Sequence, residues 1–530
     1  MQIVRIGDHS TKRHSAEEIG AKAANLAHMA ALGLPVPPAF VLPVGLCPAI
    51  VQSNGDARQQ VSAGLREGIG FLESVTGRRF GDRRQPLLVS VRSGAARSMP
   101  GMLDTVLDVG CTLAAVHGLL RQTGHPRFAW DCRRRFIESY AHVVLGLDAA
   151  SFATRRDALI ADEGVAGENA LDSEAVERLA DAFHGLVEDG DVVLPDDPVE
   201  QLENAAMAVY RSWMSERAQT YRRLQHLDDL AGTAVTVQAM VFGNRGLASG
   251  AGVAFSRDPS TGAAQPVIDI LFESQGEDVV SGSRTPETDA AISRSLPMVA
   301  AQLHDLLRLL EKEFADVQDV EFTIEDGRLW LLQTRSAKRT PQAALRFAID
   351  FVHEGLLTPA QALRRLDGVD LDKLERQRLI AGKPPAARGT PASAGIAVGR
   401  IAFDSTSAQR LVCAGDPVIL VRPDTSTADV AGFAVAAGII TAVGGRTAHA
   451  ALVARQMGRP CIVGCAALSI DVASRRGALA GSAIKEADWL SMDGESGAIY
   501  LGRCEVASER PEAELAEVAR WRSRTPAQAS

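Results

Sequence analysis

The stretch VQDVEFTIEDGRLWLLQTR, residues 317–335, determines the local fold more clearly than any other part of the chain. Two runs that alternate apolar and polar residues lie on either side of Glu325-Asp326-Gly327, and an Asp-Gly pair between such runs favours a tight hairpin turn. We therefore predict an antiparallel pair of strands, in which side chains two residues apart share one face.

This predicted hairpin carries four polar side chains at matching spacing. Asp319 and Glu321 are two residues apart on the first strand, and Gln333 and Arg335 are two apart on the second. Carboxylate and amide oxygens suit Mg²⁺, and a guanidinium binds phosphate, so the set fits a magnesium–polyphosphate site. The spacing alone is more typical of the solvent-exposed polar face of an antiparallel pair.

A second informative segment is VGGRTAHAALVARQMGRPCIVG, residues 443–464. It predicts a turn at two glycines, an N-cap at Thr447 and a helix that stops at Gly458. His449 then lies in the first helical turn, where free N–H groups and the helix dipole would stabilise a phosphate on its ring. Neutral imidazole is a competent nucleophile near pH 7. For a lone histidine, a partly buried structural role is the more common alternative.

Cationic side chains near the N-terminus fit phosphate as well. Lys22 lies in GAKAANLAHM (20–29), at the start of a predicted helix, and Arg92 and Arg97 flank a flexible loop in SVRSGAARSMPGMLDT (90–105). The spacing of a phosphate-binding P-loop is absent. Taken singly, each residue is also consistent with an ordinary exposed cation.

Composition limits the class of protein. A chain of 530 residues is expected to form roughly three or four domains. Hydrophobic content of 46% and charged content of 23% are typical of a soluble globular protein, and a net charge of −9 gives no reason to expect nucleic acid. The run Arg133-Arg134-Arg135 is interpreted as a solvated helix face. No signal peptide or membrane span is predicted, and seven cysteines without regular spacing favour a reducing, cytoplasmic location.

The segments quoted above, taken in order, resemble one family. With GTAVTVQAMVFGN, GAGVAFSRDPSTG and ESQGEDVVSGSRTPE, they are similar to the pyruvate, phosphate dikinases, which belong to the phosphoenolpyruvate-utilising enzymes. The resemblance covers about residues 1–505. SMPGMLDT is the discriminating stretch, because phosphoenolpyruvate synthases and related antibiotic phosphotransferases carry a different sequence in that loop.

The resemblance implies a multidomain fold of α/β and α+β class. We expect an ATP-grasp nucleotide-binding domain over residues 1–340, with a helical insertion at about 112–229. A helical connector and linker follow over 341–385. The Pro, Ala and Gly-rich composition of residues 383–395 by itself predicts a linker. A swivelling β/β/α phosphohistidine domain is expected over 386–505, and a charged helical tail over 506–530.

The resemblance also implies a role for each site residue. Lys22, Arg92 and Arg335 would contact the phosphates of ATP, while Asp319, Glu321 and Gln333 would hold the nucleotide's Mg²⁺. The strand that runs through Gln238, Met240 and Val241 would pass the adenine. His449 would attack the β-phosphoryl group and release AMP; orthophosphate would then take the terminal phosphoryl as pyrophosphate. Thr447 stands at the family's regulatory threonine position.

The sequence departs from the family at three points. Ala21 and Ala23 stand in a loop that is glycine-rich in the family, and Ala448 replaces the usual serine or cysteine before the histidine. Nothing in the 530 residues resembles the barrel that binds phosphoenolpyruvate and pyruvate in the family. We therefore expect the acceptor site on a separate barrel subunit, and the tail to contact a partner chain or to mediate a homodimer.

Two other functions stay open at this point. One is direct phosphorylation of a different small acceptor, and the other is a non-catalytic nucleotide-binding regulator. The presence of Lys22, Glu321, Gln333 and His449 counts against a regulator that has lost catalysis.

Overall fold

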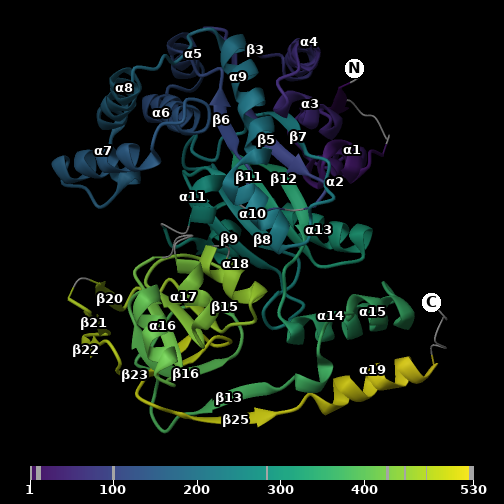
Figure 1. Ribbon diagram of the computed structural model, residues 1–530, viewed down its shortest axis with the longest axis vertical. Coiled ribbons are helices and arrows are strands. Elements are labelled where there is room, and N and C mark those ends of the chain that lie inside the picture. Colours follow the sequence, from purple (N-terminus) through teal and green to yellow (C-terminus); the bar gives the residue numbers. More distant parts are fainter. Residues whose placement is uncertain are drawn as a thin grey trace. The chain divides into compact units, whose positions relative to one another are not determined.

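The structure is a computed structural model that describes residues 3–7, 13–97, 99, 102–281, 284–424, 429–446, 449–472 and 474–524. The chain is a mixed α/β protein with several sheets (Figure 1). It divides into two compact units, of which the first comprises Met1–Ser249, Ile324–Asp326 and Trp330–Thr334, and the second comprises the remaining residues.

The first unit is built on an antiparallel five-stranded sheet. Its strands follow the order β1 (Val4–Ile6), β2 (Ala39–Leu42), β7 (Thr233–Ala239), β5 (Val89–Ala95) and β6 (Thr105–Val109). A short pair is formed by β3 (Arg79–Phe80) and β4 (Pro86–Leu87). The helices are α1 (Ala16–Ile19), α2 (Ala21–Ala31), η1 (Val44–Leu46), α3 (Cys47–Val51), α4 (Gly55–Thr76), α5 (Leu113–Thr123), α6 (Pro126–Val143), α7 (Ala149–Asp162), η2 (Glu168–Ala170), α8 (Ser173–Asp189), α9 (Pro198–Arg211), η3 (Ser212–Met214) and α10 (Glu216–Leu224).

Local sequence signals set the ends of these helices. The Asn54 side chain accepts a hydrogen bond from Ala57 N and caps α4, which stops at Gly77 in the left-handed region. Thr112 caps α5 in the same way. Figure 1 shows α6, α7 and α8 gathered into one helical layer, and their apolar faces share a core with the sheet. The helical run therefore packs as part of the first unit.

A second five-stranded sheet belongs mainly to the second unit, while Ile324–Asp326 and Trp330–Thr334, at its last two strands, belong to the first. Its order is β10 (Glu287–Thr288), β9 (Val267–Phe272), β8 (Gly250–Phe255), β11 (Gln318–Glu325) and β12 (Arg328–Ser336). The strands β11 and β12 confirm the hairpin predicted at 317–335. Asp326 (φ +48°) and Gly327 (φ +74°) both have positive φ, as a type I′ turn requires. The associated helices are α11 (Gly276–Ser281), α12 (Asp289–Ser295), α13 (Pro297–Phe314), α14 (Pro341–His353), α15 (Pro359–Arg365) and η4 (Leu371–Lys373).

Residues 387–501 contain an eight-stranded sheet. Its order is β14 (Ala387–Arg388), β24 (Ala498–Leu501), β23 (Trp489–Asp493), β16 (Ile396–Ala402), β17 (Val418–Arg422), β18 (Gly438–Thr441), β19 (Cys461–Val463) and β15 (Thr390–Ser393). The strands from β16 to β19 are parallel. The helices are α16 (Ser405–Cys413), α17 (Val430–Val435) and α18 (His449–Gln456), and a small sheet contains β20 (Leu468–Asp471), β21 (Arg476–Leu479) and β22 (Ser482–Lys485).

The segment at 383–395 was predicted to be a linker over its whole length, but part of it forms strands. Residues 387–388 and 390–393 form strands that pair with β24 and β19. The prediction was wrong for these residues because Pro391 and Gly389 are compatible with edge and bulge positions, which composition does not separate from a linker. Gly389 is needed here, since an added Cβ would lie 2.6 Å from Ile462 and 2.8 Å from Val463 O.

The chain enters and leaves this sheet region through one ribbon. Strand β13 (Arg376–Ile380) pairs antiparallel with β25 (Glu505–Glu509), and α19 (Glu512–Arg524) follows. Val518 and Trp521 of α19 are buried in the core of α14 and α15, and His353 lies 2.8 Å from Glu517. The apolar face of α19 therefore packs against α14 and α15 of the same chain. No helix among the described residues is both long and apolar enough to cross a membrane.

Candidate functional site

Lys22 is placed by a glycine that the fold requires. Gly20 joins α1 to α2 with a φ of +81°, and a Cβ there would collide with the backbone oxygen of Gly94 on β5. This close approach sets the first turn of α2 against the end of β5. Lys22 lies in that turn and is half-buried.

Two neighbouring strands of the same sheet bring Arg92 and Gln238 together. Arg92 on β5 donates from Nη1 to Oε1 of Gln238 on β7 at 3.3 Å, and Gln238 Nε2 donates to Pro37 O at 3.3 Å. Met240 and Val241 follow β7 directly and are both 9% exposed. Lys22, Arg92 and Gln238 thus belong to one unit and are carried by adjacent elements.

The hairpin places Asp319 and Arg335 in direct contact. Arg335 Nε donates to Asp319 Oδ2 at 2.8 Å, and the Asp319 side chain is only 2% exposed. Burial raises the pKa of Asp319, although the charge of Arg335 opposes this. Burial also lowers the pKa of Arg335, but the charges of Asp319 and Glu321 outweigh it and leave the pKa raised. The polar face of the hairpin, which spacing alone suggested to be exposed, is therefore largely buried at Asp319 and Arg335.

Two buried oxygens on this hairpin have unused acceptor capacity. Within the described part of the chain, Asp319 Oδ1 and Gln333 Oε1 have no hydrogen-bond partner. A buried acceptor without a partner is costly, and a hard cation would satisfy it. No group of three or more His, Cys, Asp or Glu side chains among the described residues could hold a metal ion by itself. Asp319, Glu321 and Gln333 fit Mg²⁺, which commonly uses one or two carboxylates together with substrate phosphates.

The loop before His449 is held against the sheet of the second unit. A Cβ on Gly445 would collide with Pro286 and lie 2.8 Å from Asp269 Oδ2, and Arg446 Nε donates to Pro391 O at 3.1 Å. His449 begins α18, as predicted. Its side chain, Thr447 and Ala448 lie outside the described residues. The backbone therefore places the predicted nucleophile at a helix N-terminus.

Replacing Gly445 with alanine is expected to destabilise the second unit. The rigid ring of Pro286 cannot move away easily, and overpacking of this kind costs about 1–3 kcal/mol. Hydrogen exchange in β9 and α18 should accelerate in Gly445→Ala. The matched change Gly382→Ala, whose Cβ would meet no atom within 4 Å, should leave exchange unchanged. Equal exchange in both variants would contradict this close contact.

Sequence patterns missed Arg455, which lies six residues beyond His449. Its side chain is 2% exposed, its guanidinium lies 5.0 Å from the Phe255 ring centroid, and Nη2 donates to Arg446 O at 2.5 Å. Burial lowers the pKa of Arg455, while the charge of Asp319 raises it. The available signal was an arginine in the otherwise small and apolar run AALVAR.

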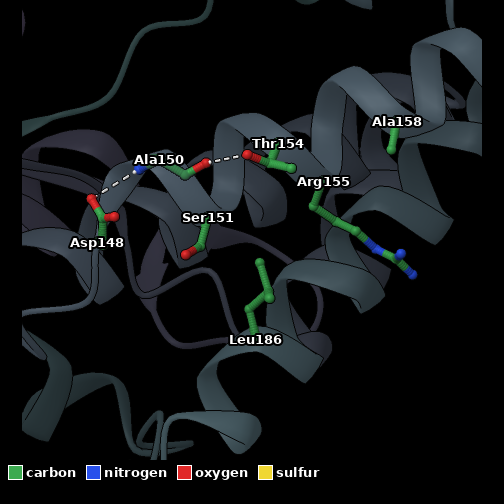
Figure 2. A pocket seen from close by; sticks show the side chains of 7 residues that line it. All are labelled: Asp148, Ala150, Ser151, Thr154, Arg155, Ala158 and Leu186. Carbon is green, nitrogen blue, oxygen red and sulfur yellow. Dashed lines mark hydrogen bonds between the residues drawn. The ribbon is translucent and has the colours of Figure 1, made fainter.

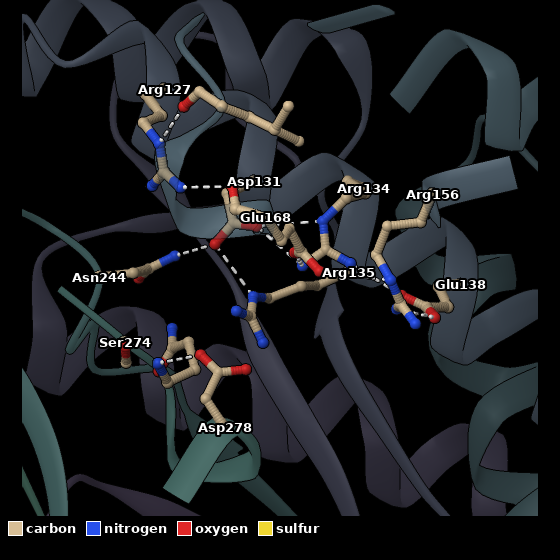
Figure 3. A network of polar contacts seen from close by, with 12 residues as sticks. Arg127, Asp131, Arg134, Arg135, Glu138, Arg156, Glu168, Asn244, Ser274 and Asp278 are labelled. Atoms are coloured by element: carbon tan, nitrogen blue, oxygen red, sulfur yellow. Dashed lines mark hydrogen bonds and ion pairs between the residues drawn. The ribbon is translucent and has the colours of Figure 1, made fainter. Parts of the chain in front are cut away.

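A second polar network corrects the interpretation of Arg133-Arg134-Arg135 (Figure 3). Arg133 and Arg134 are 4% and 3% exposed, so they do not form a solvated helix face. Arg134 binds Asp131 at 2.8 Å, Glu138 at 2.7 Å and Glu168 at 2.8 Å. The helical pattern was right, and its spacing places Asp131 and Glu138 beside Arg134, but it could not reveal Glu168 or the burial of the arginines.

Asp131 extends this network to the loop after β7. Its Oδ2 accepts from Arg135 Nε at 3.0 Å and from Asn244 Nδ2 at 2.6 Å (Figure 3). Burial alone would raise the pKa of Asp131, but the charges of Arg135 and Arg134 lower it well below its ordinary value. The network therefore joins α6 to the glycine-containing loop at Asn244.

A pocket of about 430 Å³ lies on helices α7 and α8 (Figure 2). Two of its polar lining residues bond the helix itself: Asp148 accepts from Ala150 N at 3.1 Å, and Thr154 donates to Ala150 O at 2.8 Å. Leu186 points into it from α8. The pocket therefore offers no set of groups comparable to the hairpin.

Comparisons with known proteins identify the family of this chain. A family model described as "Pyruvate phosphate dikinase, AMP/ATP-binding domain" matches residues 57–300 and 298–354. A model described as "PEP-utilising enzyme, mobile domain" matches residues 414–497. The first therefore covers most of the chain ahead of β13, and the second covers α18.

Two similar curated proteins are both named pyruvate, phosphate dikinase. A pyruvate, phosphate dikinase of Clostridium symbiosum is 42% identical over 495 residues, which are 92% of this chain and 56% of that protein. One of Rhizobium meliloti (strain 1021) is 40% identical over 527 residues, 95% of this chain and 58% of that protein. The chain spans less than two thirds of the length of these relatives. It belongs to the pyruvate phosphate dikinase AMP/ATP-binding domain family.

Proposed function

We propose that this chain binds Mg–ATP and phosphorylates its own His449, as a dikinase-type phosphotransferase. The proposal places an ATP-grasp domain over residues 1–340, with its helical insertion at about 112–229, and a swivelling phosphohistidine domain over 386–505. The connector over 341–385 and the tail over 506–530 complete this division. The relatives' name, pyruvate, phosphate dikinase, supports the activity.

The observation that carries the proposal is the buried Asp319. One of its oxygens is bound by Arg335 at 2.8 Å, and the other lacks a partner among the described residues. This arrangement suits a metal ion on one oxygen and a phosphate-binding arginine beside it. We assign Asp319, Glu321 and Gln333 to Mg²⁺, which would neutralise charge on the phosphates when bound.

The remaining assignments concern the nucleotide. We assign Lys22, Arg92 and Arg335 to the phosphates, because lysine supplies a point charge and arginine a planar fork of donors. Gln238, Met240 and Val241 would line the adenine. These side chains would hold the phosphates in line and stabilise the charge that develops during transfer.

The proposed reaction has two balanced steps. A ring nitrogen of His449 forms a bond to the β-phosphorus as the bond from that phosphorus to the α-bridging oxygen breaks, and AMP leaves with that oxygen. Orthophosphate then bonds to the terminal phosphorus as the β–γ bridge breaks, so pyrophosphate leaves and phosphohistidine remains. The N-terminus of α18 would stabilise the phosphoryl group on the ring. A threonine at 447 would serve as a regulatory position.

We propose that pyruvate or another small molecule receives the phosphoryl group at a site outside these 530 residues, either on a separate barrel subunit or elsewhere. A homodimer is a further proposal, for which sedimentation of the purified chain is a direct test. If an added small acceptor alone discharges phosphorylated His449, a separate subunit is not required.

Product analysis tests the loading reaction. Wild type with ATP, Mg²⁺ and phosphate should form AMP and pyrophosphate in amounts equal to the protein, while His449→Asn should form neither. The variant should still bind Mg–ATP with unchanged affinity, because His449 is assigned to chemistry and not to nucleotide binding. Formation of ADP, or equal AMP formation by both proteins, would contradict the proposal.

A further inference from the structure

We propose that Arg455 is a positioning residue that couples the loop of His449 to the carboxylates of the sheet; this inference rests on the proposed function. Arg455 lies on α18, and its guanidinium contacts the loop on one side and the sheet on the other. Neither contact involves a residue assigned above to the nucleotide.

The first contact fixes the loop. Arg455 Nη2 donates to Arg446 O at 2.5 Å, so a side chain on α18 binds the backbone three residues before His449. Arg446 in turn donates from Nε to Pro391 O on β15 at 3.1 Å. Arg446 is therefore held by both its backbone carbonyl and its side chain, and its position depends on the charge and reach of Arg455.

The second contact attaches the same guanidinium to the sheet. Its carbon lies 5.0 Å from the ring centroid of Phe255 on β8, a distance suited to a cation–π interaction. The charges of Arg455 and Asp319 each shift the pKa of the other, so the two groups are electrostatic neighbours. The charge of Asp269 on β9 also raises the pKa of Arg455.

Burial makes these contacts sensitive to charge. Arg455 is 2% exposed, and its Nε has no hydrogen-bond partner within the described residues. A buried guanidinium that is not fully hydrogen-bonded requires nearby negative charge to remain in place. Mg²⁺ on Asp319 would reduce that negative charge, whereas the polyphosphate of ATP would restore it. Arg455 would therefore favour this arrangement of the His449 loop when the complete Mg–ATP is bound.

Four variants test the inference: Arg455→Met, Arg455→Lys, Phe255→Leu and, as the control, Arg459→Met. Arg459 lies just beyond α18 and donates to Ala434 O at 3.4 Å. Single-turnover labelling of His449 from β-labelled ATP gives the rate and the half-saturating ATP concentration. Hydrogen exchange in α18 and β8, with and without a non-hydrolysable ATP analogue and Mg²⁺, gives a second measurement without turnover.

We expect Arg455→Met to slow labelling by about 10- to 100-fold, the effect of losing a hydrogen bond to a charged group. The half-saturating ATP concentration should change much less than the rate, because Arg455 does not contact the nucleotide in the assignment and acts on it only through the coupling. Arg455→Lys should recover most of the rate, since an ammonium can also reach a carbonyl and a ring face. Phe255→Leu should slow labelling less, and a fifth protein that combines Arg455→Met with Phe255→Leu should resemble Arg455→Met alone. Arg459→Met should match wild type.

The outcomes separate this inference from the proposed function. Labelling of Arg455→Met at the wild-type rate would overturn the inference, as would a lysine variant as slow as the methionine variant. If wild type is not labelled, the proposed function fails, and hydrogen exchange then decides the inference. Faster exchange in α18 and β8 for Arg455→Met, but not for Arg459→Met, would support the coupling. Unchanged exchange would refute it.

Discussion

Replacing Asp319 with asparagine is expected to slow phosphorylation of His449 by at least about 10²-fold, the effect of removing one preorganised electrostatic contact from a transition state. The amide keeps the size of the side chain but removes its negative charge. It also places an N–H₂ group or a weaker acceptor beside Arg335, which now donates to Asp319 Oδ2 at 2.8 Å. The substitution should therefore weaken Mg²⁺ binding and also displace Arg335.

Single-turnover rates measured across a range of Mg²⁺ concentrations are the appropriate readout. Asp319→Asn should require more Mg²⁺ for half-maximal rate, in addition to its lower maximal rate. Asp305→Asn is the matched control, because Asp305 is 71% exposed and pairs only with the neighbouring Arg308 among the contacts described. An Asp319→Asn enzyme with wild-type rate and Mg²⁺ dependence would remove Asp319 from the site.

The second large effect concerns stability. Arg134→Met should lower the free energy of opening the helical layer by about 3–5 kcal/mol, because it leaves buried carboxylates without their cation. Arg134 is 3% exposed and binds three carboxylates, Asp131, Glu138 and Glu168. Hydrogen exchange of the α6 amides in increasing denaturant measures this local free energy.

Arg178→Met is the control for this prediction. Arg178 pairs with Glu163 on the surface of the same helical layer, and exposed ion pairs contribute little. The dependence on pH follows from Asp131, whose folded pKa is lowered. Its stabilising contribution is present above its unfolded pKa and is lost as the pH falls through the folded value. The difference between wild type and Arg134→Met should therefore stay constant from neutral pH to about pH 5. Equal opening free energies for wild type and Arg134→Met would show that the network does not stabilise α6.

Sequence patterns correctly predicted the structural features that depend only on residues close together in the chain. Alternation and Asp-Gly identified the hairpin, because a strand face and a tight turn are local properties. Spacing also placed Asp319 and Arg335 in strands that the structure brings into contact. It could not show that Asp319 is buried, since burial is decided by elements distant in sequence.

The errors and omissions have the same cause. Arg134 was interpreted as exposed because local spacing, which places Asp131 and Glu138 beside it, shows neither its burial nor its third partner Glu168, 34 positions away. Arg455 was missed because Phe255 lies on a distant strand. Residues 390–393 were assigned to a linker because proline and glycine mark both linkers and sheet edges. Long-range packing supplies the information that local composition lacks.

Positional labelling of His449 is the most direct test of the central claim. Wild type is mixed rapidly with Mg²⁺, phosphate and ATP labelled on either the β- or the γ-phosphorus, then quenched and digested. The account predicts that β-label remains on the peptide containing His449 as an acid-labile, alkali-stable adduct, while γ-label leaves as pyrophosphate. His449→Asn should retain neither label. Stable γ-label on His449, or β-label on a different residue, would contradict the account.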